Sequence, residues 1–215
     1  MTKALVILSG GQDSTTALFW AKQQFDVVET ITFDYGQRHR IELESAKKVA
    51  EMAGVPHKLV EVSSIKALTN TAMINDSEIT TNTTTGLPTT FVPGRNLIFV
   101  TLAAAYAYEK GISSLIIGVS QVDFSGYPDC RKNTMESLEK TISLGMDYDF
   151  KILTPLIDKD KKETVLFAQE VGALEALAYS HTCYKGQVPP CGECPACQLR
   201  AKGFLEAGIP DPLLI

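Results

Sequence analysis

The sequence has no excess of positive charge and no long hydrophobic run. Its 215 residues carry a formal net charge of −5, which argues against a broad phosphate-binding surface of the kind that binds nucleic acids nonspecifically. The apolar run at residues 4–8 is shorter than the hydrophobic region of a secretory signal, and no stretch approaches the length of a membrane span. We therefore expect a cytoplasmic protein that acts on small molecules and binds neither nucleic acid nor membranes.

The chain is too short for two full catalytic domains. With 45% hydrophobic residues, it can bury one sizeable core and a small additional module, and no internal repeat is visible. In a reducing compartment the five cysteines are not expected to form structural disulfides, and four of them lie close together in residues 183–197. This crowding indicates a metal site.

Short apolar runs alternate with amphipathic segments along most of the chain. Strands are expected at 4–8, 27–35, 57–62, 114–120 and 150–156, and helices at 14–25, 40–54, 95–111, 133–145 and 158–172. We expect the helix at 133–145 to begin at an Asn cap and the helix at 158–172 to be the last regular one. This order predicts an α/β fold with a doubly wound, five-stranded parallel sheet, because parallel neighbours need crossover connections.

Two segments depart from this alternation. Residues 69–90 are rich in Thr and Asn and have almost no apolar periodicity, so we expect a long mobile loop there. The cysteine-rich segment begins at about residue 179. The predicted organisation is therefore an α/β domain at 1–178 and a small C-terminal metal-binding module at 179–215.

The stretch LSGGQDSTT follows the first predicted strand, where a parallel sheet presents helix N-termini to anionic ligands. Gly10 and Gly11 would let the backbone approach phosphate oxygens, and Asp13 could accept from a backbone amide or hold a magnesium-bound water. The loop lacks the lysine that Walker-type loops use in γ-phosphoryl transfer, so it suits a leaving pyrophosphate. A tight strand-to-helix turn is the alternative interpretation.

The predicted nucleotide loop comprises Leu8, Ser9, Gly10, Gly11, Gln12, Asp13, Ser14, Thr15 and Thr16. Within it, Ser9 and Ser14 are expected to supply hydroxyl donors, and the two threonines to extend a polar lip.

The four clustered cysteines have the spacing of a metal site, with seven, two and two intervening residues. The predicted ligands are Cys183, Cys191, Cys194 and Cys197. Gly192 and Pro195 would turn the chain between ligands, as a tetrahedral thiolate site requires. Four protein ligands leave no vacancy, so we expect a structural zinc ion, with an iron–sulfur cluster and an adventitious cluster of thiols as the alternatives. Lys185, Arg200 and Lys202 are expected to offset the thiolate charge.

Polar groups also gather in GVSQVDFSGYPDCR, which follows a predicted strand. Asp123 is expected to read ring N–H groups, Tyr127 to stack on a heterocycle, and Arg131 to grip a carboxylate or phosphate. A surface loop with a Gly-Tyr-Pro turn is the alternative. We expect Cys130 in this stretch to be a small buried residue.

Further candidates lie at other predicted element junctions. Arg95 and Asn96 in FVPGRN and Arg38 and His39 in FDYGQRHR add cations and hydrogen-bonding groups, with a solvated or structural role favoured for the histidine. Lys161, at the start of a predicted helix, is expected to stabilise phosphates in the transition state, although a solvated lysine in a charged run is the alternative.

The hexapeptide SGGQDS is similar to the SGGxDS signature of the PP-loop ATP pyrophosphatases, which cleave ATP between the α and β phosphates. Taken with DYGQRH, VPGRN, DFSGYPDCR, SHTCY and CGECPACQLR, it makes nearly the whole chain resemble the 7-cyano-7-deazaguanine synthases of queuosine biosynthesis. The resemblance implies an adenine-nucleotide α-hydrolase-like fold, a C–N bond-forming ligase and a homodimer.

The resemblance also implies a reaction. ATP would adenylate 7-carboxy-7-deazaguanine, ammonia would displace AMP to give an amide, and a second ATP would activate the amide oxygen so that a nitrile forms. The cofactors implied are structural zinc and magnesium with ATP. The chain is too short to include a glutaminase, so ammonia would come free or from another protein. The expected catalytic residues are Asp13, Ser14, Lys161 and Arg131, and the expected substrate contacts are Arg95, Asn96, Asp123, Tyr127 and Arg131.

Two other functions remain open at this point. A tRNA-modifying PP-loop enzyme of the thiolation or lysidine type would share SGGxDS and cysteines, but the acidic composition disfavours it. A non-catalytic nucleotide-binding or zinc interaction module would bind ATP without forming AMP.

Overall fold

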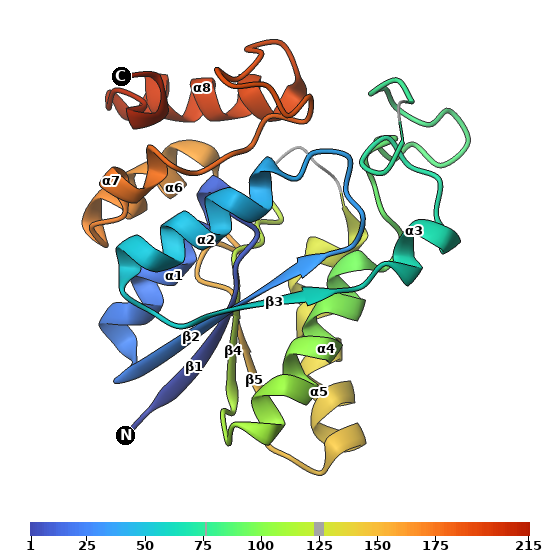
Figure 1. Ribbon diagram of the computed structural model, residues 1–215, viewed down its shortest axis with the longest axis vertical. Coiled ribbons are helices and arrows are strands. Elements are labelled where there is room, and N and C mark those ends of the chain that lie inside the picture. Colours follow the sequence, from blue (N-terminus) through green and yellow to red (C-terminus); the bar gives the residue numbers. More distant parts are fainter. Residues whose placement is uncertain (76, 123–126) are drawn as a thin grey trace.

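The computed structural model describes residues 1–75, 77–122 and 127–215 and has a five-stranded sheet at its centre (Figure 1). The strands are β1 (Lys3–Ile7), β2 (Val27–Asp34), β3 (His57–Glu61), β4 (Ser114–Ile117) and β5 (Lys151–Leu153). Their order is β3-β2-β1-β4-β5, and every neighbouring pair is parallel. The predicted doubly wound parallel sheet is confirmed.

Helices cover both faces of this sheet (Figure 1). The longer helices are α1 (Gln12–Gln24), α2 (Ile41–Ala53), α4 (Arg95–Glu109), α5 (Lys132–Met146), α6 (Lys161–Glu170) and α8 (Pro195–Ala207). Shorter elements are α3 (Ser64–Leu68), α7 (Leu174–Leu177) and the 3-10 turns η1 (Pro128–Cys130) and η2 (Pro212–Leu214). No helix in the described ranges is long and apolar enough to cross a membrane.

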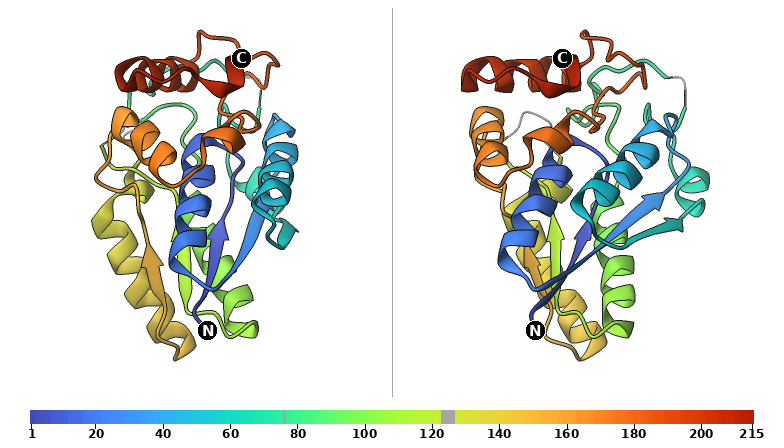
Figure 2. Two further views of the ribbon diagram at one scale, coloured as in Figure 1. Left: turned by 90° about the vertical axis from the view of Figure 1, so that its left-hand side faces the viewer. Right: turned by 60° about the vertical axis from the view of Figure 1, so that its left-hand side comes forward.

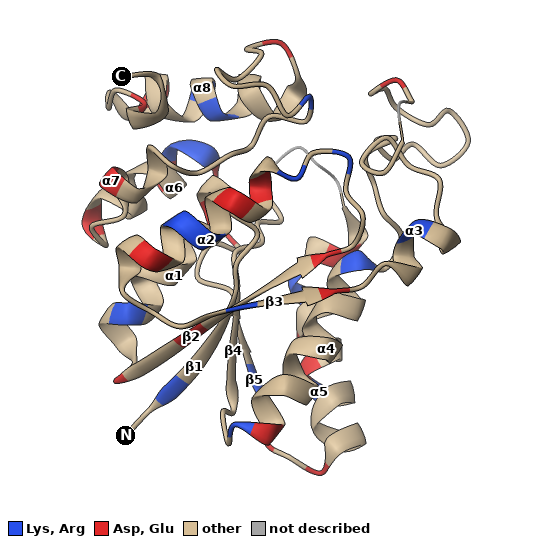
Figure 3. Cartoon of the chain, in the orientation of Figure 1, with Lys and Arg blue, Asp and Glu red and all other residues tan. Residues whose placement is uncertain are grey.

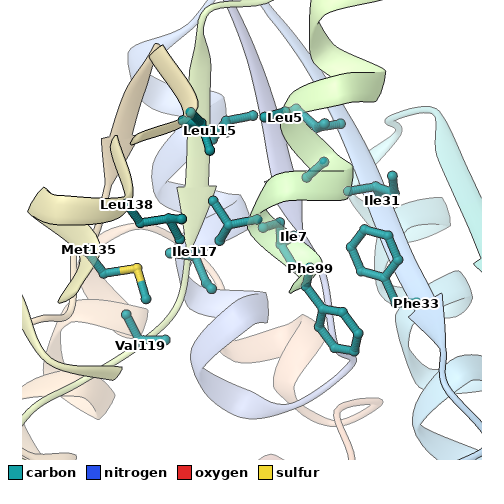
Figure 4. Packing of buried hydrophobic residues seen from close by; sticks show 14 of the residues in the cluster. Leu5, Ile7, Ile31, Phe33, Phe99, Leu115, Ile117, Val119, Met135 and Leu138 are labelled. Carbon is teal, nitrogen blue, oxygen red and sulfur yellow. The ribbon is translucent and has the colours of Figure 1, made fainter. Parts of the chain in front are cut away.

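The central strand β1 is buried on both faces because its side chains alternate between two clusters. Leu5 and Ile7 pack in the cluster that includes residues of α4 and α5, whereas Ala4 and Val6 pack in the cluster that includes residues of α1 and α2. Figure 4 shows the first cluster, in which the Phe33 ring stacks on the ring of Phe99 from α4. This two-sided burial explains the continuous apolar run in the sequence.

Two predictions of secondary structure are wrong. The helix expected at 133–145 begins at Lys132, so Asn133 lies inside α5 and does not cap it. The helix at 158–172 is not the last one, because α7 and α8 follow it. Helix α8 begins inside the cysteine cluster, where Pro195 occupies an early position that suits proline because no N–H is needed there. Because the cysteine-rich segment was interpreted only as a metal-binding module, this helix was not predicted from the sequence.

The segment at 69–90 contains no helix or strand in its described part, as expected, but it is not featureless. An isolated bridge joins Thr81 to Pro88, and the Asn82 carboxamide oxygen accepts from the backbone N–H of Thr84 at 2.9 Å. Helix α3, directly before this segment, was not predicted. The mobility of the segment stays a prediction.

The C-terminal segment lies at the end of the molecule opposite the N-terminus (Figure 2). Phe204 of α8 shares a hydrophobic cluster with Val165 and Ala168 of α6 and Leu177 of α7. The proposed domain boundary after residue 178 stays a prediction, and this cluster contains residues from both sides of it.

Candidate active site

A cavity of about 280 Å³ lies at the carboxyl ends of the strands. Its walls come from the residues after β1, β2 and β4, from the first turns of α1, α2, α4 and α6, and from the C-terminal segment. In a parallel sheet this edge is where ligands bind. The cavity is therefore the candidate active site.

The SGGQDS loop forms one wall of this cavity. The Ser9 backbone N–H donates to the Ser14 Oγ at 3.1 Å, the two serine hydroxyls lie 3.0 Å apart, and the Ser14 hydroxyl donates to the Gly11 carbonyl at 3.2 Å. These bonds hold the turn together before any ligand is bound. The cavity is lined by the predicted loop residues Leu8, Ser9, Gly11, Gln12, Asp13 and Ser14.

The remaining loop residues have structural tasks. Thr15 and Thr16 are fully buried and donate their hydroxyls to the carbonyls of Gly11 and Gln12, so the predicted polar lip is wrong. The hydroxyls sit one helical turn beyond their acceptors, where threonine bonds readily to the preceding turn.

Gly10 is needed for a contact between the loop and α2. Its φ is +84°, and a Cβ there would overlap the Glu42 carbonyl oxygen and lie 2.8 Å from the Ala46 nitrogen. The absence of a side chain at Gly10 thus allows α2 to pack against the loop. From the sequence, the same absence was expected to let the backbone approach phosphate oxygens.

Two predicted catalytic residues meet in the cavity. The Lys161 ammonium donates to both Asp13 carboxylate oxygens, at 2.7 and 2.6 Å. Their side chains are only 12% and 26% exposed, respectively, so this pair is better shielded from solvent than a surface salt bridge. Lys161 begins α6, whose N-terminus is fixed by a capping box between Asp160 and Glu163.

Helix α8 packs against the backbone and Cβ of Lys161 at Gly203. A Cβ at Gly203 would lie 2.8 Å from the Lys161 Cβ and 2.9 Å from its carbonyl oxygen, so α8 reaches α6 here only because residue 203 has no side chain. We expect Gly203→Ala to lower stability by about 1–3 kcal/mol through overpacking and to reduce turnover by displacing Lys161.

Thermal unfolding and steady-state kinetics would test this expectation. Gly208→Ala is unsuitable as a control because Gly208 has a φ of +68°, whereas Gly145 in α5 has open space around it and no positive φ. Gly145→Ala should leave turnover unchanged. A Gly203→Ala protein with wild-type stability and turnover would contradict the proposed packing.

The wall of the cavity also contains a cation among aromatic rings. An Arg95 guanidinium nitrogen donates to the Tyr35 hydroxyl at 3.4 Å. Tyr127 hydrogen-bonds to Thr90 at 2.6 Å and stacks on Phe91 with ring centroids 5.6 Å apart. The structure thus places two predicted substrate contacts, Arg95 and Tyr127, in the cavity wall.

Asn96 also lines the cavity, but its polar groups bind η1. Its backbone N–H donates to the Asp129 carboxylate at 3.0 Å, and its amide nitrogen lies 3.3 Å from the Cys130 sulfur. Burial raises the pKa of the Cys130 thiol to about 12, so this cysteine is neutral and inert at neutral pH. The expected buried role of Cys130 is confirmed.

Other predicted site residues do not line the cavity. Arg131 is exposed and belongs to a shallow depression beside Lys132, because the η1 turn directs Asp129 and Cys130 inward instead.

The predicted candidates after β2 also lie outside the cavity lining. Arg38 is exposed, and the half-buried His39 ring packs closely against Gly186. Asp123 lies outside the described residues.

Several cavity residues were not predicted. The cavity is also lined by Tyr35, Gln37, Glu42, His181, Thr182 and Tyr184. The last three flank the first cysteine in SHTCY, so the motif contained a signal. Glu42 lies in an ordinary charged helix pattern, which gives no signal. The His181 backbone N–H donates to the Gly10 carbonyl at 2.8 Å and ties the C-terminal segment to the loop.

Burial raises the pKa of the Glu42 carboxyl from its ordinary value of 4.5 to about 7, although nearby Arg95 opposes this shift. As pH rises from 4.5 to 7, the unfolded chain releases this proton before the folded protein does, so the folded state loses stability. Above pH 7 the loss is complete and amounts to roughly 3 kcal/mol. We therefore expect Glu42→Gln to raise Tm by several degrees at pH 8 and much less at pH 5. A Tm difference that does not depend on pH would contradict this.

The four cysteines converge on one point. Their sulfur atoms all lie within 4.8 Å of one another, and those of Cys191 and Cys197 are 3.9 Å apart. Tetrahedral zinc with bonds of about 2.3 Å separates its sulfurs by about 3.8 Å, so the donor set fits. The backbone N–H groups of Tyr184 and Cys194 point at cluster sulfurs at 3.4 Å. The cluster can hold a metal ion.

The cations expected to offset the thiolates have acidic partners of their own. Lys185 pairs with Glu193 at 2.9 Å, and Lys202 is 3.8 Å from Glu206. Arg200 is buried, forms a 2.7 Å pair with Asp211 and lines the cavity.

Comparisons with known proteins agree on one family. A family model described as "Queuosine biosynthesis protein QueC" matches residues 3–208. A 7-cyano-7-deazaguanine synthase of Chromobacterium violaceum is 56% identical, with 99% of this chain and 93% of the relative covered. One of Staphylococcus saprophyticus is 50% identical, with 94% and 92% covered.

Among solved structures, the fold is similar to that of a predicted subunit of a tRNA methyltransferase from Methanocaldococcus jannaschii. The TM-score is 0.52 at 22% identity, and the match covers 79% of this chain and 75% of that one. At this identity the likeness concerns the fold alone.

Proposed function

Because the chain belongs to the QueC family of queuosine biosynthesis proteins, we propose that it catalyses the ATP-dependent conversion of 7-carboxy-7-deazaguanine and ammonia to 7-cyano-7-deazaguanine. AMP and pyrophosphate are the other products. The observation that carries this proposal is the Asp13–Lys161 pair beside the SGGQDS loop in a cavity at the sheet edge.

The proposed reaction activates an oxygen of the substrate twice. First, a carboxylate oxygen attacks the α-phosphorus of ATP, pyrophosphate leaves, and ammonia then displaces AMP from the acyl adenylate to give an amide. Next, the amide oxygen attacks a second ATP in the same way. Loss of AMP and of the two amide protons leaves the nitrile. Each activation needs a site that stabilises the leaving pyrophosphate.

The chain supplies groups for that task. Backbone N–H groups of the loop and the Ser9 and Ser14 hydroxyls would bind the pyrophosphate, and Lys161 would neutralise its growing negative charge. Magnesium bound with ATP supplies further positive charge at the phosphates. Asp13 has the carboxylate oxygens that magnesium prefers, so it would orient Lys161 and hold magnesium-bound water.

We also propose that the cysteine cluster binds zinc in a structural role. All four ligands come from the chain, so the geometry offers no position for a reacting water. Metal analysis of the purified protein tests this: zinc at one ion per chain supports the proposal, and iron with acid-labile sulfide would assign the cluster to iron–sulfur chemistry instead.

Charge distribution supports small-molecule substrates. Lys and Arg are interspersed with Asp and Glu in Figure 3, and the net charge of the whole chain is −5. Enzymes that hold tRNA need clustered phosphate contacts. We further propose a cytoplasmic homodimer that takes ammonia from solution or from another protein, and light scattering would measure its mass.

The decisive experiment supplies magnesium-ATP, ammonia and 7-carboxy-7-deazaguanine and follows AMP, pyrophosphate and the mass of the organic product. A nitrile formed together with AMP supports the proposal. AMP formation that depends on another acceptor, such as tRNA, would move the activity elsewhere among PP-loop enzymes. Absence of ATP cleavage with every acceptor would favour a binding module.

A further inference from the structure

We propose that Glu42 recognises the ring of the substrate by accepting hydrogen bonds from two adjacent N–H donors on its guanine-like edge. This inference rests on the proposed function, because it takes the substrate to be a 7-deazaguanine. Glu42 lies outside all the sequence motifs described above. The observations that carry it are the position of Glu42, its lack of a protein partner and the chemistry of the cavity wall around it.

Glu42 holds a fixed place beside the nucleotide loop. It lies in the first turn of α2, and its backbone carbonyl occupies the space that a side chain at residue 10 would fill. Helix α2 therefore packs directly against the backbone of the loop at Gly10. The Glu42 carboxylate, on this anchored backbone, lines the cavity.

Glu42 and Asp13 are the two acidic side chains among the described residues that line this cavity, and their situations differ. Both oxygens of Asp13 accept from Lys161. The Glu42 carboxylate has no hydrogen bond or ion pair to any described residue, although Arg95 is near enough to influence its charge. A half-buried carboxylate without donors is less well stabilised than one in water, and because it lines the cavity its two oxygens are available to a ligand that brings donors.

The substrate edge provides those donors. A 7-deazaguanine carries a ring N1–H and a 2-amino group side by side, which match the two oxygens of one carboxylate in a bidentate pair. Its neighbouring 6-oxo group is an acceptor, and Arg95 supplies donors on the same wall. Tyr35 and Tyr127 give that wall flat surfaces suited to a heterocycle.

The pKa of Glu42 supports this assignment. Its rise to about 7 reflects burial of the charge, and ligand N–H donors would stabilise the ionised form. The substrate carboxylate is attached to the five-membered ring, remote from the N1–H and amino edge. A ring held at Glu42 therefore directs its reacting group away from α2 and into the remainder of the cavity.

The adenine of ATP is the competing occupant of this wall. Its equivalent edge has an amino donor beside a ring nitrogen acceptor, so an ionised carboxylate satisfies one group and faces the lone pair of the other. A glutamine would suit adenine well, because it has one acceptor and one donor. Glu42→Gln consequently separates the two assignments.

The experiment compares the wild type, Glu42→Gln and Glu44→Gln, whose exposed glutamate lies in the same turn of α2. For Glu42→Gln we expect KM for 7-carboxy-7-deazaguanine to rise roughly 10- to 100-fold, as for loss of a charge-assisted hydrogen bond, with KM for ATP within about twofold. Preference over the analogue that lacks the 2-amino group should fall in parallel. Glu44→Gln should match the wild type.

Each other outcome overturns the proposal in a recognisable way. A wild-type enzyme that does not turn over 7-carboxy-7-deazaguanine removes the proposed function and this inference with it. A wild type that does so, with an unchanged KM in Glu42→Gln, removes the role of Glu42 alone. Unchanged kinetics in Glu42→Gln with a raised KM for ATP in Glu42→Ala would assign the wall to adenine.

Binding measured by calorimetry provides a second test that does not depend on turnover. The wild type should bind 7-carboxy-7-deazaguanine without ATP, and Glu42→Gln should bind it roughly 10- to 100-fold more weakly. Equal affinities would overturn the assignment. Glu42→Asp, which keeps the charge but shortens the side chain, replaces Glu42→Gln if the latter does not fold.

Discussion

Asp13→Asn is expected to lower the rate of AMP formation by at least about 100-fold while leaving the protein folded. The Asp13 carboxylate binds the Lys161 ammonium through both oxygens, and asparagine would offer a single neutral acceptor. In the roles proposed above, Lys161 would then lose its orientation toward the phosphates, and a magnesium-bound water would lose the carboxylate that accepts its hydrogen bond. Single-turnover measurement of AMP and pyrophosphate reports this step directly.

The control for this prediction lies next to Lys161. Lys162 is exposed at the start of the same helix, so Lys162→Ala should leave the rate unchanged, whereas Lys161→Ala should match Asp13→Asn. If the two residues act as a unit, the double variant Asp13→Asn/Lys161→Ala should be no slower than either single one. Wild-type turnover in Asp13→Asn would remove Asp13 from the reaction.

Cys194→Ser is expected to lower metal content, Tm and activity together. The four sulfurs lie within 4.8 Å of one another, so loss of the metal would leave thiolates that repel and would release the segment that holds them. We expect Tm to fall by about 10 °C or more, as for a loss of about 4 kcal/mol in a domain of this size. Metal analysis and thermal unfolding of the same sample measure both effects.

Activity should follow the metal because the cluster and the cavity share a segment. His181 and Thr182 line the cavity, and the next residue is Cys183, the first cysteine of the cluster. Cys130→Ser is the matched control, since that cysteine is buried but lies outside the cluster and its replacement should leave metal content unchanged. A metal-free Cys194→Ser protein with wild-type Tm would refute a structural role.

Features that depend on local sequence were predictable. The alternation of buried strands and amphipathic helices predicted the five-stranded sheet, because apolar periodicity reports which faces are covered. The spacing of the cysteines predicted their cluster, because few chain paths bring four thiols so near one another in fifteen residues without a common centre. Lys161 was recognised through its position at a helix start.

Features that depend on tertiary packing were not predictable. Gly10 has the φ of a tight turn, but glycine is needed at this position because α2 packs against it. No local sequence pattern predicts that contact. Arg131 was expected in the site because of its motif, and only the path of η1 shows that it points outward. In the sequence, Glu42 cannot be distinguished from a solvent-exposed helix residue, and only the tertiary structure places it in the cavity wall.

The central strand pairs with neighbours from both halves of the chain, and this topology constrains how the molecule reaches its native state. Lys3 pairs with Val27 of β2, but Ala4 pairs with Ser114 of β4, much farther along the chain. Because distant contacts form after the nearer loops close, β1, β2 and β3 are expected to assemble first. Until β4 arrives, β1 presents an open apolar edge to other molecules. Refolding yield should therefore fall as protein concentration rises, even though the finished sheet buries that edge completely.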